Sequence, residues 1–365
     1  MKIPWANLYL DKTELNEVIK AVKSGQLSQG VRVAQFEEKM RQFVQTKYAV
    51  AVNSGTAALD VALKILKIQP QDEVIVPAFT YIASASCILY QGATPVFCDI
   101  DPITYTIDPE DVAQKITKKT KCIIAVDYAG QGPDYKKLRK IARAYNIPIV
   151  EDAAPGLGGA QDGKKLCSLG DISITSFHAA KIMSTIEGGM IFTNKASWRD
   201  QMHIIRSQGE DLSHKYHHPL LGHNYRMTEL GAAFGLAQAK RLNKLLAKRA
   251  NIASFYTKQL KKLSGLILPQ VAKGNKHAWF LYPILVEKRD KLRAYLAKQG
   301  ISTNVSWPLP IYDQKPYQQF KKQRCLVAER VAKHVLCLPM YYIMTNKEME
   351  YIIEHIQKGM KKLED

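Results

Sequence analysis

The first 45 positions of the chain carry apolar residues at helical spacing. Residues 12–24 form an amphipathic pattern that ends at Gly25, and a second pattern of this kind runs over about residues 33–43. Between the two lies Leu-Ser-Gln-Gly, which is typical of a turn. Residues 1–45 are therefore predicted to form a helical lead-in to the rest of the chain.

From residue 48 to about residue 193, short apolar runs alternate with helical patterns. Several runs lack the alternation of a half-exposed strand, as expected for strands that are buried on both faces. Helical spans such as 56–68 and 134–145 separate most of the runs. This order predicts an α/β layout around a mainly parallel sheet. The predicted strands are residues 48–52, 73–76, 94–99, 120–127, 148–151, 172–176 and 189–193.

The pattern changes in the last third of the chain. Helices are expected over residues 228–246 and onward to about residue 260. There follow a lone strand at residues 278–286 and a helix at 289–299. A loop rich in proline and tryptophan comes next at 305–316, and a final helix at 346–362. We therefore predict a large domain over residues 1–245, which includes the helical lead-in, and a smaller C-terminal α+β domain over residues 246–365.

The composition is that of an ordinary soluble protein, with 46% hydrophobic and 23% charged residues. No apolar stretch approaches the roughly 20 residues of a membrane span, and the start of the chain lacks the apolar core of a secretory signal. The six cysteines are scattered without a Cys-x-x-Cys pair, which favours reduced, buried thiols. These features favour a cytoplasmic location with no membrane partner.

The unusual bulk feature is a net charge of +19. Most of it lies in residues 241–365, which hold 24 Lys and Arg against 9 Asp and Glu. Such a lobe attracts anions, so nucleic acid and a nucleotide-diphosphate substrate are both candidates. Its lysines are spread through helical segments and form no tract interleaved with aromatic residues, so a solvated basic surface is the favoured interpretation and nucleic acid is disfavoured.

The first motif with chemical content is Val-Asn-Ser-Gly-Thr-Ala-Ala-Leu at residues 52–59, where a strand turns into a helix. Free amides at a helix N-terminus, together with a hydroxyl, can bind a phosphate. The motif lacks the lysine and the spacing of a nucleotide P-loop. By itself, such a turn is more often a structural helix cap.

The second motif is Val-Glu-Asp-Ala-Ala at residues 150–154, at the predicted carboxyl end of a strand. Adjacent strand residues point to opposite faces, so only one of the two acids can enter a given cleft. Ligands of open α/β sheets bind beyond the carboxyl ends of strands. A carboxylate there suits a metal, a ribose hydroxyl or a protonated ring nitrogen.

The third motif is Ser-Phe-His-Ala-Ala-Lys, which ends at Lys181 and is followed by Glu-Gly-Gly-Met at residues 187–190. A lysine in an apolar, small-residue setting is suited to a lowered pKa and to Schiff-base chemistry. An ordinary surface lysine is the alternative, but this lysine lies between two predicted strands. Four histidines, His214, His217, His218 and His223, lack regular ligand spacing, so no metal site is predicted.

Together, these motifs resemble the DegT/DnrJ/EryC1/StrS aminotransferases, the sugar aminotransferases of pyridoxal 5'-phosphate (PLP) fold type I. Further ordered matches extend the resemblance over nearly the whole chain. They are Asp-Glu-Val-Ile-Val-Pro-Ala-Phe-Thr-Tyr (72–81), Gly-Ala-Thr-Pro-Val-Phe (92–97), Gly-His-Asn-Tyr-Arg-Met-Thr-Glu-Leu (222–230) and Leu-Pro-Met (338–340). The resemblance implies an aspartate-aminotransferase-like large domain that binds PLP, with pyridoxamine phosphate as the intermediate form of the cofactor.

The resemblance also implies roles for individual residues. Lys181 would hold PLP covalently and act as the general base, and Asp152 would keep the ring nitrogen protonated. The phosphate would be bound by Gly55, Thr56, Ala57 and Ser176, and Tyr81 would stack on the ring. Asn224 would reach the phosphate of a partner subunit in a homodimer with shared active sites. Substrate would lie beside His178 and Glu187.

Two departures from the family stand out. Where members commonly have Gln, His or Glu near the ring hydroxyl, this chain has Pro155, which offers no hydrogen bond. A histidine often found in the proline-rich loop is replaced by Ser306 and Trp307, so the sugar specificity is expected to differ.

The function implied is transfer of an amino group from L-glutamate to a nucleotide-linked keto sugar. Ser-Phe-His with a Glu-Gly-Gly turn favours sugar C4 over C3. A PLP-dependent sugar dehydratase is one alternative, although those enzymes carry His in place of the lysine. A regulatory or nucleic-acid-binding relative without catalysis is the other, and the presence of Lys181 and Asp152 disfavours it.

Overall fold

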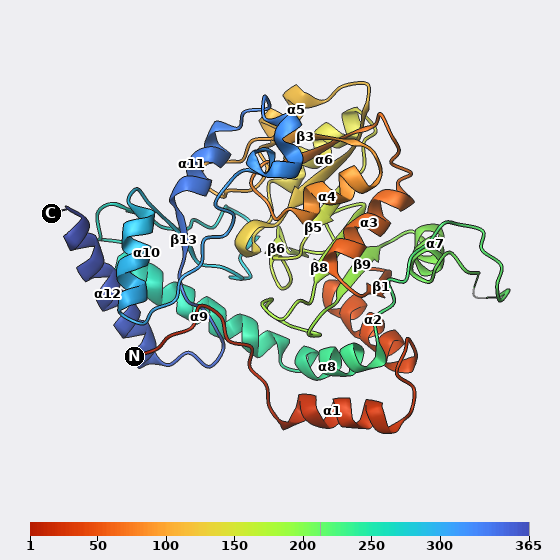
Figure 1. The fold of residues 1–365 in the computed structure, drawn as a ribbon, viewed down its shortest axis with the longest axis horizontal. Helices are drawn as coiled ribbons and strands as arrows, with labels where there is room; N and C mark the ends of the chain where they lie inside the picture. Colours follow the sequence, from red (N-terminus) through yellow and green to blue (C-terminus); the bar gives the residue numbers. More distant parts are fainter. Residues whose placement is uncertain (212, 365) are drawn as a thin grey trace.

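A computed structural model describes residues 1–211 and 213–364, and its centre is a seven-stranded sheet (Figure 1). The pairs along β3-β2-β4-β5-β8 are parallel, whereas β9 runs antiparallel to both of its neighbours. The mainly parallel sheet predicted from the sequence is therefore confirmed. In spatial order the strands are β1 (Tyr48–Val52), β9 (Gly189–Thr193), β8 (Ile172–Ser176), β5 (Ile149–Asp152), β4 (Thr120–Val126), β2 (Glu73–Pro77) and β3 (Thr94–Cys98).

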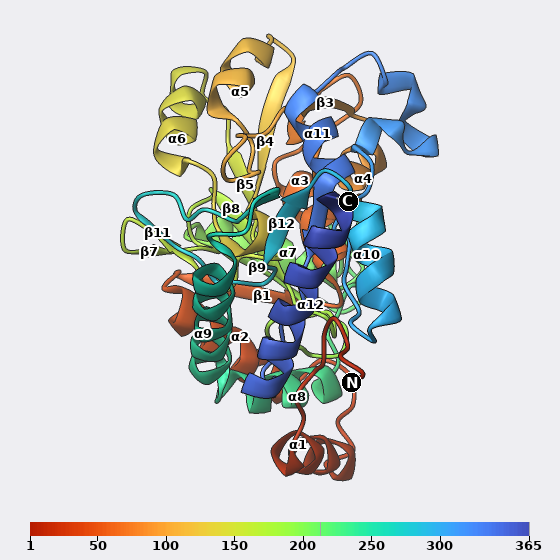
Figure 2. The ribbon, with the colours of Figure 1, turned by 90° about the vertical axis from the view of Figure 1, so that its left-hand side faces the viewer.

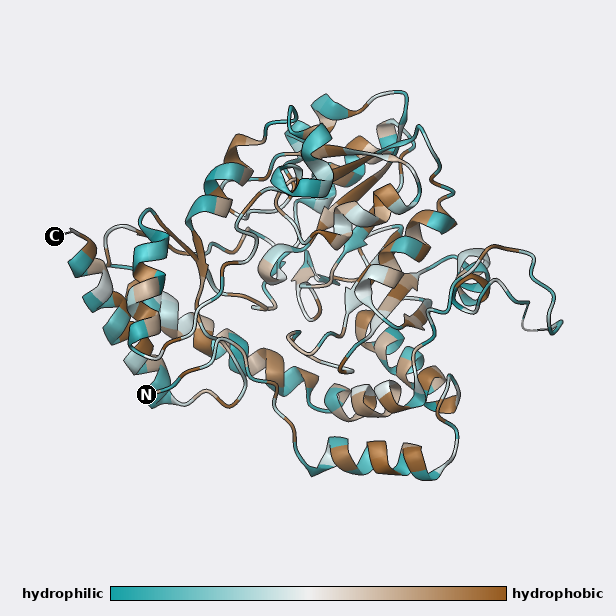
Figure 3. Ribbon diagram, in the orientation of Figure 1, coloured by the Kyte–Doolittle hydropathy of each residue, from teal (hydrophilic) through white to brown (hydrophobic). Residues whose placement is uncertain are grey.

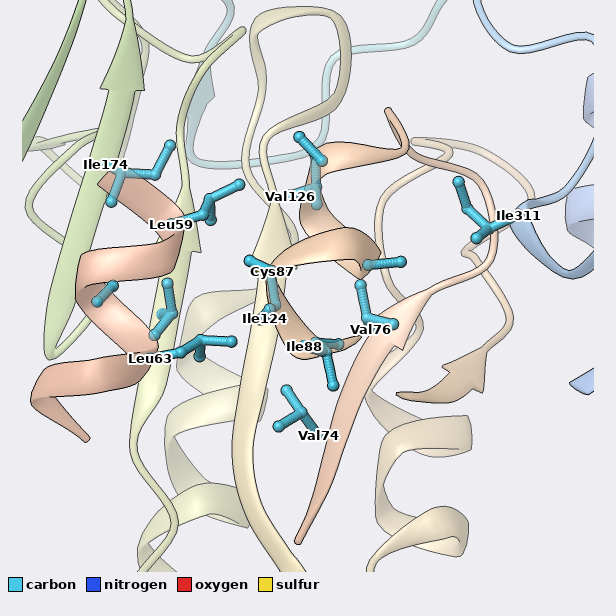
Figure 4. Close-up of a cluster of buried hydrophobic side chains, with 14 of the residues drawn as sticks. Leu59, Leu63, Val74, Val76, Cys87, Ile88, Ile124, Val126, Ile174 and Ile311 are labelled. Atoms are coloured by element: carbon cyan, nitrogen blue, oxygen red, sulfur yellow. The ribbon is translucent and has the colours of Figure 1, made fainter. Parts of the chain in front are cut away.

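The central strands are buried on both faces, which explains their unbroken apolar sequences. In β4, Cys122, Ile124 and Val126 share a core with α3 and α4 (Figure 4). The alternate residues Ile123 and Ala125 belong to a second core with α5 and α6. These helices are α3 (Gly55–Ile65), α4 (Ala83–Tyr90), α5 (Pro109–Lys115) and α6 (Tyr135–Ala144).

The predicted helical lead-in is present and lies along one end of the molecule (Figures 1 and 2). Helix α2 (Val31–Val44) packs on β1 and α8, and α1 (Lys12–Lys23) packs on α8. The predicted helix over 228–246 is divided, since α8 (Glu229–Ala239) ends before α9 (Leu242–Leu260) begins. Helix α7 (Ala196–Arg206) precedes a loop that projects from the body in Figure 1.

The C-terminal part contains more than the lone strand expected there. Strand β12 (Pro283–Val286) pairs with β10 (Leu266–Ile267) and β13 (Val335–Cys337). The expected strand over 278–286 is wrong in its first half, because Trp279 has a left-handed φ of 54° that interrupts the extended backbone. The helices are α10 (Arg289–Lys298), α11 (Leu326–His334) and α12 (Asn346–Glu364), and short strands β6 (Ala160–Gln161), β7 (Lys164–Lys165) and β11 (Asn275–Lys276) form a separate small sheet.

The segment 311–337 joins the core of the large sheet. Ile311 lies in that core beside residues of α4 and β2 (Figure 4), and Tyr317 is 1% exposed within it. The carboxylate of Asp99 accepts hydrogen bonds from the amides of Val327 and Ala328 at the start of α11. The short 3₁₀ helices η2 (Ile311–Asp313) and η3 (Lys315–Phe320) lie in this segment. The division at residue 245 falls inside α9 and stays a prediction.

Among the described residues, no helix is both long enough and apolar enough to cross a membrane.

Candidate active site

The register of the sheet brings the three sequence motifs to one edge. Gly189 at the start of β9 pairs with Val52 on one side and with Ser176 on the other. Both partners are the last residues of their strands, and Asp152 ends β5 next to β8. The three motifs therefore meet where the carboxyl ends of the parallel strands meet, the usual ligand position in open α/β folds.

A cavity of about 640 Å³, the central cavity, opens at this edge. It is also lined by Trp5, Phe280, Asn304 and Trp307 from outside the motifs. Its wall contains eight of the ten residues to which the family resemblance gave site roles, namely Gly55, Thr56, Tyr81, Asp152, Ser176, His178, Lys181 and Glu187. Ala57 and Asn224 are absent from this wall.

The N-terminus of α3 offers backbone donors to the central cavity. Ser54 caps the helix, since its side chain accepts from the amide of Ala57 and its carbonyl from that of Ala58. The cap therefore engages the Ala57 amide that the sequence assigned to a phosphate. Within the described residues, the amides of Gly55 and Thr56 have no partner, so they can bind an anion with help from the helix dipole.

Close packing behind this helix end favours glycine at position 55 and requires it at position 189. A Cβ on Gly55 would lie 3.0 Å from Cβ of Ser176, and a Cβ on Gly189 would lie 2.3 Å from the carbonyl oxygen of Ser54. The absence of both side chains lets β8, β9 and the start of α3 approach one another. The Ser176 side chain and the free amides consequently lie at the same end of the central cavity.

The two adjacent acids face opposite ways, as the strand geometry predicts. Asp152 lines the central cavity, and Glu151 instead accepts from the amides of Cys167, Leu169 and Gly170. Burial raises the pKa of Asp152, while the Ser84 hydroxyl, the Ala154 amide and the Lys181 ammonium act to lower it. Glu151 therefore organises a loop, and Asp152 presents its carboxylate to a ligand.

Lys181 also lies on the wall of the central cavity. Burial lowers its pKa to about 8, although the Asp152 carboxylate acts in the opposite direction. Its Nζ is 4.6 Å from the centre of the Phe280 ring. A lysine with this pKa has a much larger neutral fraction near neutral pH than an ordinary lysine, and the neutral amine is the form that attacks a carbonyl.

Exposed groups lie at the mouth of the central cavity. Nε2 of His178 is 3.7 Å from Oε1 of Glu187, and both side chains are more than half exposed. Tyr81 is 61% exposed, so the face of its ring is free to cover a bound molecule. The proline-rich loop contributes both Ser306 and Trp307 to the cavity wall, and the Ser306 hydroxyl is hydrogen-bonded to that of Tyr128 at 2.8 Å.

These residues fit PLP. Amides at a helix end suit its phosphate, a carboxylate suits its ring nitrogen, and an amine of lowered pKa suits its aldehyde. The structure has all three groups on the wall of one cavity.

Comparison with known proteins supports the same conclusion. A model of the DegT/DnrJ/EryC1/StrS aminotransferase family matches residues 8–357. The chain belongs to this family. The DegT/DnrJ/EryC1/StrS aminotransferases are PLP-dependent, so this chain is a PLP-dependent sugar transaminase of fold type I.

Individual relatives match along nearly their full length. GDP-perosamine synthase of Caulobacter vibrioides is 36% identical over 351 residues, 94% of each chain. The dTDP-3-amino-3,6-dideoxy-alpha-D-galactopyranose transaminase of Aneurinibacillus thermoaerophilus is 33% identical over 354 residues, 96% of each chain. A Streptococcus pneumoniae structure, described as a sugar aminotransferase in its PLP form, has a TM-score of 0.94 and 30% identity, and the match covers 100% of both chains.

Three further residues of this DegT/DnrJ/EryC1/StrS aminotransferase were assigned no role from the sequence, although Thr80 lies in the motif at residues 72–81. Thr80 and Ser84 follow β2 and approach Asp152, and Phe280 lies against Lys181. Thr80 and Ser84 could have been found, because they follow the carboxyl end of a predicted strand. Phe280 had no such signal, because a contact across the fold brings it to the lysine.

Proposed function

We propose that this aminotransferase moves an amino group from L-glutamate to C4 of a nucleotide-linked keto sugar, a deoxysugar in particular. The observation that supports catalysis is the central cavity, whose wall includes Lys181, Asp152 and the free amides of α3. The names of two relatives, GDP-perosamine synthase and a dTDP-aminosugar transaminase, support a nucleotide-linked sugar.

PLP, when bound, supplies an electron sink for the reacting carbon. The amides of Gly55 and Thr56 and the Ser176 hydroxyl would orient its phosphate, and Asp152 would hold a proton on its ring nitrogen. Lys181 would hold the cofactor through its Nζ, and the same amine would move protons at the reacting carbon. The pKa of about 8 suits both tasks, because a useful general base titrates near the working pH.

The position of amination rests on the motifs beside Lys181. His178 and Glu187, from the Ser-Phe-His and Glu-Gly-Gly sequences, approach each other at the mouth of the central cavity, where an acceptor sugar would enter. These sequences favour C4. A relative whose name specifies a 3-amino product favours C3 as the second candidate.

Product analysis tests the function directly. With L-glutamate and PLP, we expect conversion of a nucleotide-linked 4-keto-6-deoxy sugar to the 4-amino product, identified by mass spectrometry and by NMR assignment of the aminated carbon. The matched control is the corresponding 3-keto sugar, which should react at least about tenfold more slowly. A preference for the 3-keto sugar would assign amination to C3, and inertness toward both would contradict a nucleotide-sugar substrate.

We also propose a homodimer with shared active sites. Asn224 lies on the loop between α7 and α8, where it is exposed and does not line the central cavity of its own chain. Helix α1 exposes Leu15, Ile19 and Val22, whose helical spacing places them in one apolar stripe. Figure 3 shows that hydrophobic and hydrophilic residues alternate along this helix. Exposed apolar stripes of this kind commonly mark contact surfaces.

Mixing two inactive variants tests the sharing of sites. If Asn224 completes the partner's site, Lys181→Ala and Asn224→Ala subunits should restore activity when they exchange, because one site of each heterodimer is then intact. We expect up to about a quarter of wild-type activity at equal mixing, with subunit exchange verified by native mass spectrometry. The test requires that Asn224→Ala alone is severely impaired. If the subunits then exchange and no activity returns, Asn224 lies outside the partner's site.

A further inference from the structure

A chain of buried hydroxyl groups ends on Asp152. The Ser84 hydroxyl donates to Oδ2 of Asp152 at 2.7 Å, and the Thr80 hydroxyl lies 2.9 Å from that of Ser84. Asp152 is 4% exposed, Thr80 1% and Ser84 0%, so water does not replace these contacts easily. The other oxygen, Oδ1, accepts from the amide of Ala154 at 3.2 Å and from no other group among the described residues.

The direction of this chain follows from its donors. A serine hydroxyl has one proton, and that of Ser84 points to the Asp152 carboxylate. The contact between Ser84 and Thr80 then requires Thr80 to donate. Both hydroxyl dipoles are therefore aligned toward Asp152, and each hydrogen bond polarises the next.

We propose that Thr80 and Ser84 form a directed hydroxyl relay that fixes the orientation and the negative charge of Asp152 for its contact with the ring nitrogen of PLP. Ser84 and Thr80 are positioning residues, since both act through Asp152. The inference rests on the role of Asp152 in the proposed function. Burial disfavours the ionised carboxylate, and the charge-assisted bond from Ser84 is the largest influence that opposes it.

The surrounding structure holds the relay in place. Ser84 lies in the first turn of α4, where its amide donates to the carbonyl of Tyr81. Thr80 and Tyr81 connect β2 to that helix, so the relay and the predicted ring-stacking residue belong to one short segment. The residues that support Asp152 and the residue predicted to cover the cofactor are therefore positioned by the same short segment of backbone.

Helix α4 supplies a matched control for the test. The hydroxyl of Ser86 is hydrogen-bonded to that of Tyr317 at 2.9 Å. Among the described residues, no hydrogen bond connects Ser86 to Asp152. Ser84→Ala should lower kcat by roughly 10- to 100-fold, the range expected for loss of a hydrogen bond to a charged group. Ser86→Ala removes the same atom from the same helix and should change kcat less than about threefold.

A spectroscopic readout separates positioning from general damage. With PLP isotope-labelled at the ring nitrogen, the Ser84→Ala holoenzyme should show an NMR shift toward the unprotonated ring, and Ser84→Thr should restore the wild-type shift. Thr80→Val should change the shift in the same direction but less. An unchanged ring-nitrogen shift in Ser84→Ala, with PLP bound, would overturn the proposal.

A double-mutant cycle distinguishes failure of the relay from failure of the proposed function. In an Asp152→Asn background, Ser84→Ala should cost no further activity, because no charge remains for the relay to hold. A severe Asp152→Asn effect with additive Ser84→Ala loss would overturn the relay and keep the function. A harmless Asp152→Asn would instead remove the proposed role of Asp152 itself.

Discussion

We expect the replacement of Lys181 with alanine to abolish turnover and to leave the fold intact. Within the described residues, Lys181 is the one lysine on the wall of the central cavity, so no second amine can bind the cofactor or move the proton. Turnover should fall by at least about a thousandfold, since general acid–base catalysis alone contributes about 10²–10⁴-fold. The measurements are steady-state rates together with circular dichroism and the melting temperature.

Lys195 provides a matched control. Its ammonium lies 3.8 Å from the centre of the Trp198 ring, as that of Lys181 lies over Phe280, but Lys195 is absent from the cavity wall. Lys195→Ala should keep near wild-type turnover. In the wild-type holoenzyme, borohydride should fix PLP on Lys181. Recovery of the label on another lysine would refute the assignment.

Replacing Asp152 with asparagine should lower kcat by more than about 100-fold. A neutral amide cannot hold a proton on the ring nitrogen by charge, and a factor of this size corresponds to about 3 kcal/mol of transition-state stabilisation. The amide oxygen can still accept from Ser84, so the fold should be retained. Steady-state kinetics at saturating PLP measures the effect, and thermal unfolding checks the fold.

Glu151, the neighbouring acid, provides a matched control for Asp152→Asn. Glu151→Gln removes the same charge one residue away, from a side chain that accepts hydrogen bonds from backbone amides and from Ser173. We expect Glu151→Gln to lower the melting temperature and to keep kcat within about fivefold of wild type. If Glu151→Gln abolished turnover in folded protein and Asp152→Asn did not, the two roles would have to be exchanged.

Local sequence patterns predicted most of the fold. Each of the seven strands of the large sheet was found, because buried parallel strands are short apolar runs between helices. The pattern failed where the backbone changes direction without a glycine or proline. The left-handed Trp279 interrupts the strand expected over 278–286, and the break at Lys240 and Arg241 divides a helical pattern that continues on both sides.

The candidate site was predicted to the extent that its residues lie in local motifs. Lys181 and Asp152 follow strands, so the order of the chain indicated a common edge. The relay and Phe280 depend on contacts between elements far apart in sequence: Ser84 is 68 residues from Asp152. The role of Asn224 stays a prediction: its carbonyl accepts a hydrogen bond from the Asn53 side chain, but Asn224 does not line the central cavity of its own chain.

The attachment of segment 311–337 to the large sheet limits how the enzyme can admit its substrates. A rigid-body swing of the C-terminal part would have to pull the buried Ile311 and Tyr317 out of the core and break the amide contacts of Asp99. Such a hinge motion would expose apolar surface, at a free-energy cost of about 25 cal/mol per Å². Opening and closing over the acceptor sugar should therefore be confined to the loops at the mouth, with the two lobes moving as one body during turnover.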